Sequence, residues 1–231
     1  MNPAPLLYAA IMGLQSSMNG MLSGTQIEQI SDKIKRFAIA TAIASGISGS
    51  TPGAGVALAV VAQTGLIWSM YVQINKTLGI SIKENVLKFI GSAVLTNLIN
   101  NFGSYLASYV AAGIASLFVG VGTAVAFFLY AAIGYVCTYT SAVVYLRLLT
   151  KFVKSDGSID IDESDKTTKA VDEVINDMDI KSTFSEAQSE FKEARRNGEL
   201  KNARKNPTCP SCGGKITIGQ KFCSNCGNPL K

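Results

Sequence analysis

The first strong pattern along the chain is a helical repeat of apolar positions that begins at residue 25. The stretch "TQIEQISDKIKRF" places four large apolar side chains on one face of a helix: Ile27, Ile30, Ile34 and Phe37. Thr25 is a suitable N-cap, because Glu28 follows three residues later as in a capping box. We expect this helix to end near "SGSTPGAG", where Pro52 and the surrounding glycines cannot continue it.

Three further helices are expected before the chain turns polar. One covers about residues 56–78 and closes at Gly79, since glycine is a typical C-cap residue. Another starts near Ser81 and reaches a break at the glycines of 120–122, and the last ends at about residue 153. The segment "NKTLGISIKEN" then joins two helical hairpins.

The charged segment after residue 153 predicts a different kind of structure. Its residues are expected to form a solvated, partly helical stalk, in which Thr183 caps a helix and Glu186 stands at the capping-box position. Four cysteines follow near the C-terminus. The sequence therefore predicts a mainly α protein of four parts: a lead-in at 1–24, an apolar helical-hairpin domain at 25–153, a charged, partly helical linker at 154–206, and a small β zinc ribbon at 207–231.

Charge is distributed very unevenly along the chain. Residues 37–75 and 89–146 contain no charged side chain, whereas 147–231 holds 15 of the 21 basic and 13 of the 16 acidic residues. A bilayer span needs roughly 20 mostly apolar residues, so 89–146 is compatible with two spans. We therefore expect a bundle that inserts into membrane lipid. The alternative is a conditional inserter, soluble while its hairpins are buried among its own helices or in a homo-oligomer.

The basic residues of the hairpin domain agree with a membrane topology. They precede the first hairpin, lie between the hairpins or follow the second: Lys33, Lys35, Arg36, Lys76, Lys83, Lys88, Arg147, Lys151 and Lys154. The hairpin tips carry none. Under the positive-inside rule, both termini, the middle loop and the zinc ribbon are predicted to be cytoplasmic.

The cysteine spacing near the C-terminus predicts a metal site. The ligands form two C-x2-C pairs separated by ten residues: Cys209, Cys212, Cys223 and Cys226. Four thiolates with no open position are typical of closed structural zinc, and Gly213 and Gly227 let the backbone fold under the ion. The alternative is a pair of disulfides. Because the chain has no histidine, the commonest general base is missing, and we expect a protein without enzyme activity.

The ribbon is expected to serve as a recognition module. Its stretch "KITIGQK" predicts a short β-hairpin that faces a partner. Several basic residues could contact phosphates: Lys215 and Lys221, with Arg195, Arg196, Lys201, Arg204 and Lys205 upstream. Phe222 is the one aromatic residue there, so a protein partner is favoured over nucleic acid.

Two parts of the chain resemble known families. Residues 209–230 resemble the short bacterial and archaeal zinc ribbons, whose four metal ligands match the four cysteines named above. Residues of about 33–153 resemble the YcjF-type domain of bacterial inner-membrane proteins, which often follows Era-like or dynamin-like GTPase domains. Three stretches carry this likeness: "IASGISGSTPGAG", "QTGLIWSMYVQINKTLGI" and "FVGVGTAVAFFLYAAIG".

The second resemblance has consequences for function, and one departure. The family commonly has an acidic residue just after the proline turn, where this chain has only glycine, alanine and valine. The resemblance implies membrane association and a GTPase partner in trans, because no GTPase domain occurs in the sequence. It carries over no catalytic residue.

The function expected from the sequence is a non-enzymatic, membrane-associated protein. Its helical hairpins would anchor a cytoplasmic zinc ribbon that recruits a protein partner. Two alternatives stay open: a conditionally inserting or pore-forming helical protein, and a soluble helical module whose tail binds nucleic acid.

Overall fold

The computed structural model describes residues 4–49, 55–115, 123–205, 207–209, 211–217, 220 and 222–228. The helices in this part of the chain are α1 (Pro5–Ser17), α2 (Gly24–Gly49), α3 (Gly55–Leu78), α4 (Glu84–Ala115), α5 (Thr123–Phe152), α6 (Asp165–Asp177), α7 (Ile180–Arg196) and α8 (Glu199–Lys205). The mainly α fold expected from the sequence is confirmed. No β-strand forms within the described residues, where pairing is limited to isolated bridges.

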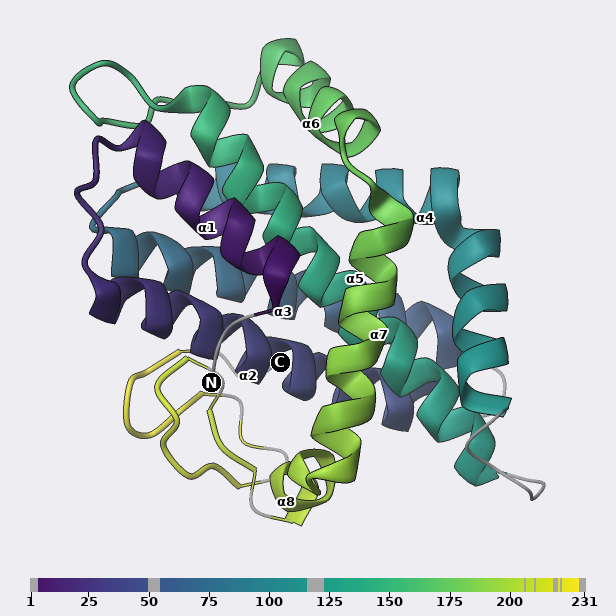
Figure 1. Ribbon diagram of the computed structural model, residues 1–231. Coiled ribbons are helices and arrows are strands. Elements are labelled where there is room, and N and C mark those ends of the chain that lie inside the picture. The colour runs from purple at the N-terminus through teal and green to yellow at the C-terminus, as the bar shows by residue number, and fades with distance from the viewer. Residues whose placement is uncertain are drawn as a thin grey trace.

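Helix α5 lies at the centre of the bundle (Figure 1). It packs against α1, α2, α3, α4, α6 and α7, and every residue from 134 to 146 is buried. Within the described residues, α5 is the helix that is long and apolar enough to cross a bilayer, over Val125–Phe152. Most of that stretch is nevertheless covered by the protein's own helices, so its apolar side chains have protein partners.

Small side chains bring α2 and α5 unusually close together. A Cβ added at Gly134 of α5 would lie 2.5 Å from Ser45 Oγ and 3.0 Å from the Thr41 carbonyl oxygen of α2. A Cβ at Gly46 of α2 would in turn lie 2.6 Å from the ring of Phe127. Glycine at these positions lets the two helix backbones approach, which larger side chains would prevent.

Buried polar groups between the helices form defined pairs. The Tyr71 and Tyr145 rings stack with centroids 3.9 Å apart, and Tyr145 Oη donates to Asn75 Oδ1 at 2.7 Å. Gln63 Nε2 donates to Ser45 Oγ at 3.1 Å. Burying an amide or hydroxyl costs free energy unless it is hydrogen-bonded, so these pairs help to determine which helix faces which.

The segment expected to be a solvated stalk instead contributes to the core, and that prediction is wrong for α6 and α7. Their apolar positions are buried against α4 and α5: Ala170, Val171, Val174, Ile175, Phe184, Ala187, Phe191 and Ala194. In Figure 1, α7 crosses α5 at an angle and α6 lies near the C-terminal end of α5. Both helices are amphipathic, with one face toward the bundle and a charged face outward.

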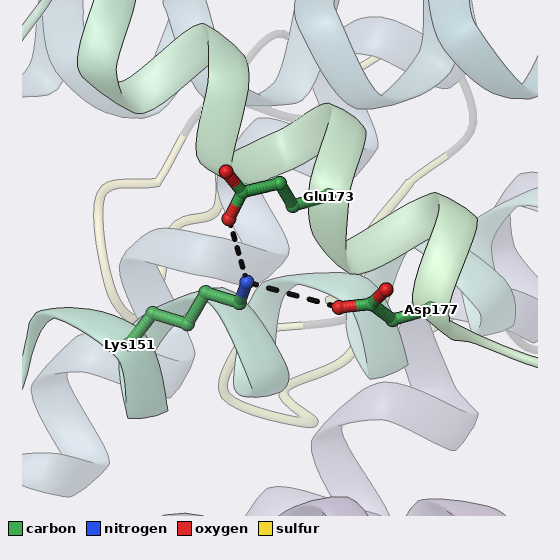
Figure 2. A network of polar contacts seen from close by, with 3 residues as sticks. All are labelled: Lys151, Glu173 and Asp177. Carbon is green, nitrogen blue, oxygen red and sulfur yellow. Dashed lines mark hydrogen bonds and ion pairs between the residues drawn. The ribbon is translucent and has the colours of Figure 1, made fainter.

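An ion-pair network marks the outer edge of this packing. Figure 2 shows Lys151 of α5 between two carboxylates of α6, with Nζ at 2.8 Å from Glu173 Oε2 and 3.9 Å from Asp177 Oδ2. All three side chains are exposed, so the network adds little to stability. Its importance is that charge lies directly beside the end of the most apolar helix.

Two of the expected helix starts are shifted. The first capping box uses Ser23 and Gln26 in place of Thr25 and Glu28: Ser23 N donates to Gln26 Oε1 at 2.9 Å, and Gln26 N donates to Ser23 Oγ at 3.2 Å. The expected C-cap Gly79 is confirmed, because it follows α3 with a φ of +70°.

Helix α7 is capped by Asp179 rather than Thr183, because the Asp179 side chain accepts a hydrogen bond from Ser182 N. Glu186, expected to complete that capping box, has a different role. Its carboxylate accepts hydrogen bonds from Leu6 N and Leu7 N at 2.9 and 3.2 Å, and so caps the start of α1 from α7. It also accepts one from Tyr139 Oη at 2.6 Å.

Candidate metal centre

The four predicted cysteine ligands converge on one point. Their Sγ atoms all lie within 4.8 Å of one another. Cys209 and Cys223, the first residue of each C-x2-C pair, are buried, whereas Cys212 and Cys226 are exposed. The cluster therefore sits half under its own backbone, with its second cysteines toward solvent.

Each pair of cysteines belongs to the same small backbone turn. Gly213 N donates to Cys209 O at 2.7 Å, and in the second turn Gly227 N donates to Cys223 O at 2.8 Å. The two glycines adopt φ values of +75° and +70°, a region that side-chain-bearing residues avoid. The sequence expectation that glycine lets the backbone fold under the ion thus corresponds to a repeated turn.

Backbone and side-chain N–H groups point at the sulfur atoms. Gly214 N donates to Cys212 Sγ at 3.4 Å, Asn225 N donates to Cys223 Sγ at 3.4 Å, and Asn225 Nδ2 donates to Cys212 Sγ at 3.5 Å. Such donors stabilise thiolate charge and hold ligands in place.

The two exposed thiols have different pKa values because their surroundings differ. Burial and the neighbouring thiols raise the pKa of Cys226 to about 12. At Cys212, burial is outweighed by the hydrogen bonds from Asn225 and Gly214, which lower the pKa to about 6. A divalent ion that binds these thiols must displace their protons.

The spacing of the sulfur atoms is compatible with a metal site and too wide for disulfides. Zn–S bonds of about 2.3 Å in a tetrahedron place sulfur atoms about 3.8 Å apart. Cys209 and Cys226 have an Sγ–Sγ distance of 3.7 Å, as do Cys212 and Cys223. A disulfide requires about 2.05 Å. The arrangement is compatible with a metal site, and it would hold the ion as a closed structural centre.

The C-terminal segment that carries the four cysteines also contacts the helical body. A Cβ at Gly213 would lie 2.6 Å from Arg36 Nη1 of α2, so the guanidinium lies against the first cysteine turn. Asn228, after the second turn, lines a cleft of about 360 Å³ together with Trp68 and Lys76 of α3. Figure 1 likewise shows the C-terminal segment beside α2.

The recognition surface predicted for the ribbon is described only in part. Residues 218, 219 and 221 of "KITIGQK" lie outside the described residues, and the observed β pairing is the bridge between Thr208 and Lys215. Two basic residues assigned to phosphates on sequence grounds lie elsewhere. The guanidinium carbons of Arg195 and Arg204 lie 4.8 and 5.3 Å from the ring centroids of Phe128 and Phe127.

Sequence reasoning singled out the four cysteines that the structure brings together but missed the residues that surround them. Asn225 stands between the cysteines of the second pair, and nothing in the C-x2-C spacing distinguishes it. From the sequence, Arg36 was interpreted only as one of the positive charges that set the membrane topology. Its contact with Gly213 depends on how the chain folds back, which the local pattern does not contain.

Comparison with known proteins adds no relative. No protein-family model matches the chain, and neither the curated proteins nor the solved structures give a significant match. The resemblances to short zinc ribbons and to the YcjF-type domain therefore stay predictions.

Proposed function

We propose that the protein is a non-enzymatic scaffold in which a zinc-loaded ribbon, held against a helical body, recruits a protein partner. The closed cysteine cluster carries this proposal. Four thiolates fill the positions of a tetrahedral ion and leave no open position for a substrate or an activated water. A GTPase acting in trans is the partner class implied by the resemblance of residues 33–153.

The exposed side of the ribbon supplies the contact surface. Phe222, directly before Cys223, has 59% of its surface exposed. Lys215, at the bridge with Thr208, is exposed as well. Exposed aromatic residues next to a rigid backbone are favourable anchors, because they bury a large area and lose little side-chain entropy on binding.

A substitution at Phe222 tests recruitment separately from metal binding. Phe222→Ala leaves all four cysteines in place, so we expect one zinc per chain but partner binding weakened by about 30-fold, the equivalent of ~2 kcal/mol. Quantitative cross-linking in cells measures the partner, and metal analysis of the same protein measures zinc.

A matched control removes an exposed apolar side chain elsewhere. Ile99 of α4 is 40% exposed and far from the ribbon in sequence. Ile99→Ala is expected to leave recruitment unchanged. Equal cross-linking yields for the wild type, Phe222→Ala and a cysteine variant would show that the ribbon does not carry the partner.

A second candidate function is conditional membrane insertion through α5. Two features support it: α5 is long and apolar, and the helices that cover α5 carry carboxylates. The covering carboxylates lie along its length: Glu186 accepts from Tyr139, and Glu173 pairs with Lys151. Insertion would require α6 and α7 to leave α5 first. The predicted topology, with cytoplasmic termini, depends on hairpin tips at 50–54 and 116–122, which lie outside the described residues.

Membrane fractionation distinguishes a chain that is always anchored in the membrane from one whose apolar helix α5 is covered by its own helices. Because charged helices lie along α5, we expect an alkaline carbonate wash to release the chain from membranes. Retention after the wash would favour the anchor and contradict a body whose apolar helix is covered by protein. Release at rest, combined with retention after addition of anionic vesicles, would identify conditional insertion.

A further inference from the structure

A cavity of about 550 Å³ lies between α1, α2, α5 and α7, and none of the four clustered cysteines lines it. This volume is within the usual range for small-ligand sites. Tyr135 and Tyr139 of α5 are its buried aromatic residues, and charged residues come from α2 and α7. The lining includes six side chains of relevant chemistry: Glu28, Asp32, Lys35, Tyr135, Tyr139 and Glu190.

The Tyr135 hydroxyl is the first sign that the cavity has an occupant. Tyr135 is fully buried, and its Oη has no hydrogen-bond partner among the described residues. Burial, followed by carboxylates of α7 and α8, Glu190 foremost, raises the pKa of this hydroxyl, so it stays neutral. Buried hydroxyls are normally paired, because an unpaired one costs free energy. A ligand in the cavity would supply the missing partner.

The second sign is a half-buried carboxylate that accepts no hydrogen bond within the described part of the chain, although the charge of Lys35 acts on it. Glu190 is half-buried and has no hydrogen bond or ion pair among the described residues. Burial, and then the charge of Glu193, raises its pKa, while the charge of Lys35 lowers it against these causes. The basic residue of the lining is engaged elsewhere, since Lys35 Nζ pairs with Glu199 Oε1 at 2.9 Å.

Pairing also neutralises one of the other acids. Asp32 Oδ2 lies 2.6 Å from Arg36 Nη2. Glu28, which is exposed, and Glu190 form no ion pair among the described residues, and the three acids of the lining outnumber its one base, Lys35. Its preferred ligand is therefore positive.

A metal ion is not the positive ligand that this cavity suits. Within the part of the chain that the structure describes, the cysteine cluster is the one group of three or more metal-ligating side chains whose donor atoms converge. The cavity carboxylates are too dispersed to share one small ion. An organic cation is larger and uses different contacts: a carboxylate on one side and aromatic faces on the other. The Tyr135 and Tyr139 rings, with centroids 6.5 Å apart, are the aromatic groups of the lining that could take this part.

We propose that this cavity binds a small alkyl amine in its protonated, primary ammonium form. The ammonium donates one hydrogen bond to Tyr135 Oη and another to the Glu190 carboxylate, while its alkyl chain lies along the tyrosine rings. A primary ammonium is required because a quaternary one has no N–H to offer the hydroxyl. The molecule that bears this ammonium must be small, because the Tyr135 hydroxyl that it contacts is fully buried. The site does not depend on the partner proposed for the ribbon.

Calorimetric titration of the full, zinc-loaded chain with 1,5-diaminopentane tests the proposal. Glu190→Gln and Tyr135→Phe remove one contact each and keep the side-chain size, so we expect each to weaken binding at least about tenfold. Glu163→Gln removes an exposed carboxylate outside the cavity and is expected to bind like the wild type. Tetramethylammonium should bind more weakly than the diamine by a similar factor.

Two results would overturn the proposal. One is the absence of diamine binding up to ~10 mM, a concentration at which even very weak sites fill. The other is equal affinity in the wild type and Glu190→Gln.

Thermal unfolding without ligand gives an independent readout. If Oη has no protein partner, Tyr135→Phe keeps or raises Tm, and the diamine raises Tm of the wild type but not of the variant. A lower Tm for Tyr135→Phe would show that the hydroxyl already has a protein partner, and the inference would fail.

Discussion

Replacing Cys223 with serine is expected to release the metal and unfold the ribbon while the helical bundle stays folded. Cys223 is buried and belongs to the second cysteine turn. A module of this size has little core, and structural zinc supplies on the order of 10 kcal/mol or more to such folds. We expect zinc to fall from one ion per chain to a small fraction of one, with nearly unchanged helical circular dichroism.

Acid should have the same effect on the wild type. Zinc binds thiolates, so protons compete with it and its affinity falls as pH is lowered. Metal analysis after dialysis at decreasing pH, under reducing conditions, measures this release. The control is Cys137→Ala, because Cys137 is buried in α5 outside the cluster. A wild-type chain with far less than one zinc, or full zinc retention by Cys223→Ser, would contradict the metal assignment.

Replacing Phe191 with alanine is expected to destabilise the whole helical body by about 3–5 kcal/mol, the usual cost of truncating a buried phenylalanine. Phe191 of α7 is 1% exposed, and its ring centroid lies 5.7 Å from that of Tyr135 in α5. The loss is a large part of a typical domain stability of about 5–15 kcal/mol. Urea unfolding followed by circular dichroism measures it.

The same variant decides between a core helix and a stalk. Ser189→Ala, at an exposed position of the same helix, is the matched control and is expected to change stability by no more than about 0.5 kcal/mol. If Phe191→Ala were equally mild, α7 would be solvated, as its composition first indicated. A cooperative loss shared by all helices would establish that residues after 153 fold together with the hairpins.

Features that depend on residues close together in the sequence were predicted well, whereas features that depend on distant segments were not. Gly79 marks the end of α3 because a C-cap depends on neighbouring residues alone. The cysteine cluster could be predicted from the sequence in the same way, because two short turns set most of its geometry. Capping residues were shifted where several polar candidates stood side by side, as with Ser23 and Thr25.

The contribution of α6 and α7 to the core was missed for a different reason. The signal was present: apolar residues recur at helical spacing through Val171, Val174, Ile175 and Met178. It was overlooked because the surrounding charges dominate the composition. Contacts between distant segments, such as Glu186 with the start of α1 or Arg36 with Gly213, depend on the complete fold and have no local signature.

The order of the elements along the chain affects how this protein is made. Helix α5 is synthesised before α6 and α7, which cover it in the finished molecule. At typical translation speeds of about 5–20 residues per second, the stretch between Phe152 and Arg196 takes ~2–9 s to complete. Throughout that interval the most apolar helix emerges from the ribosome without its outer cover. Apolar surface exposed in this way before folding is complete is prone to aggregate.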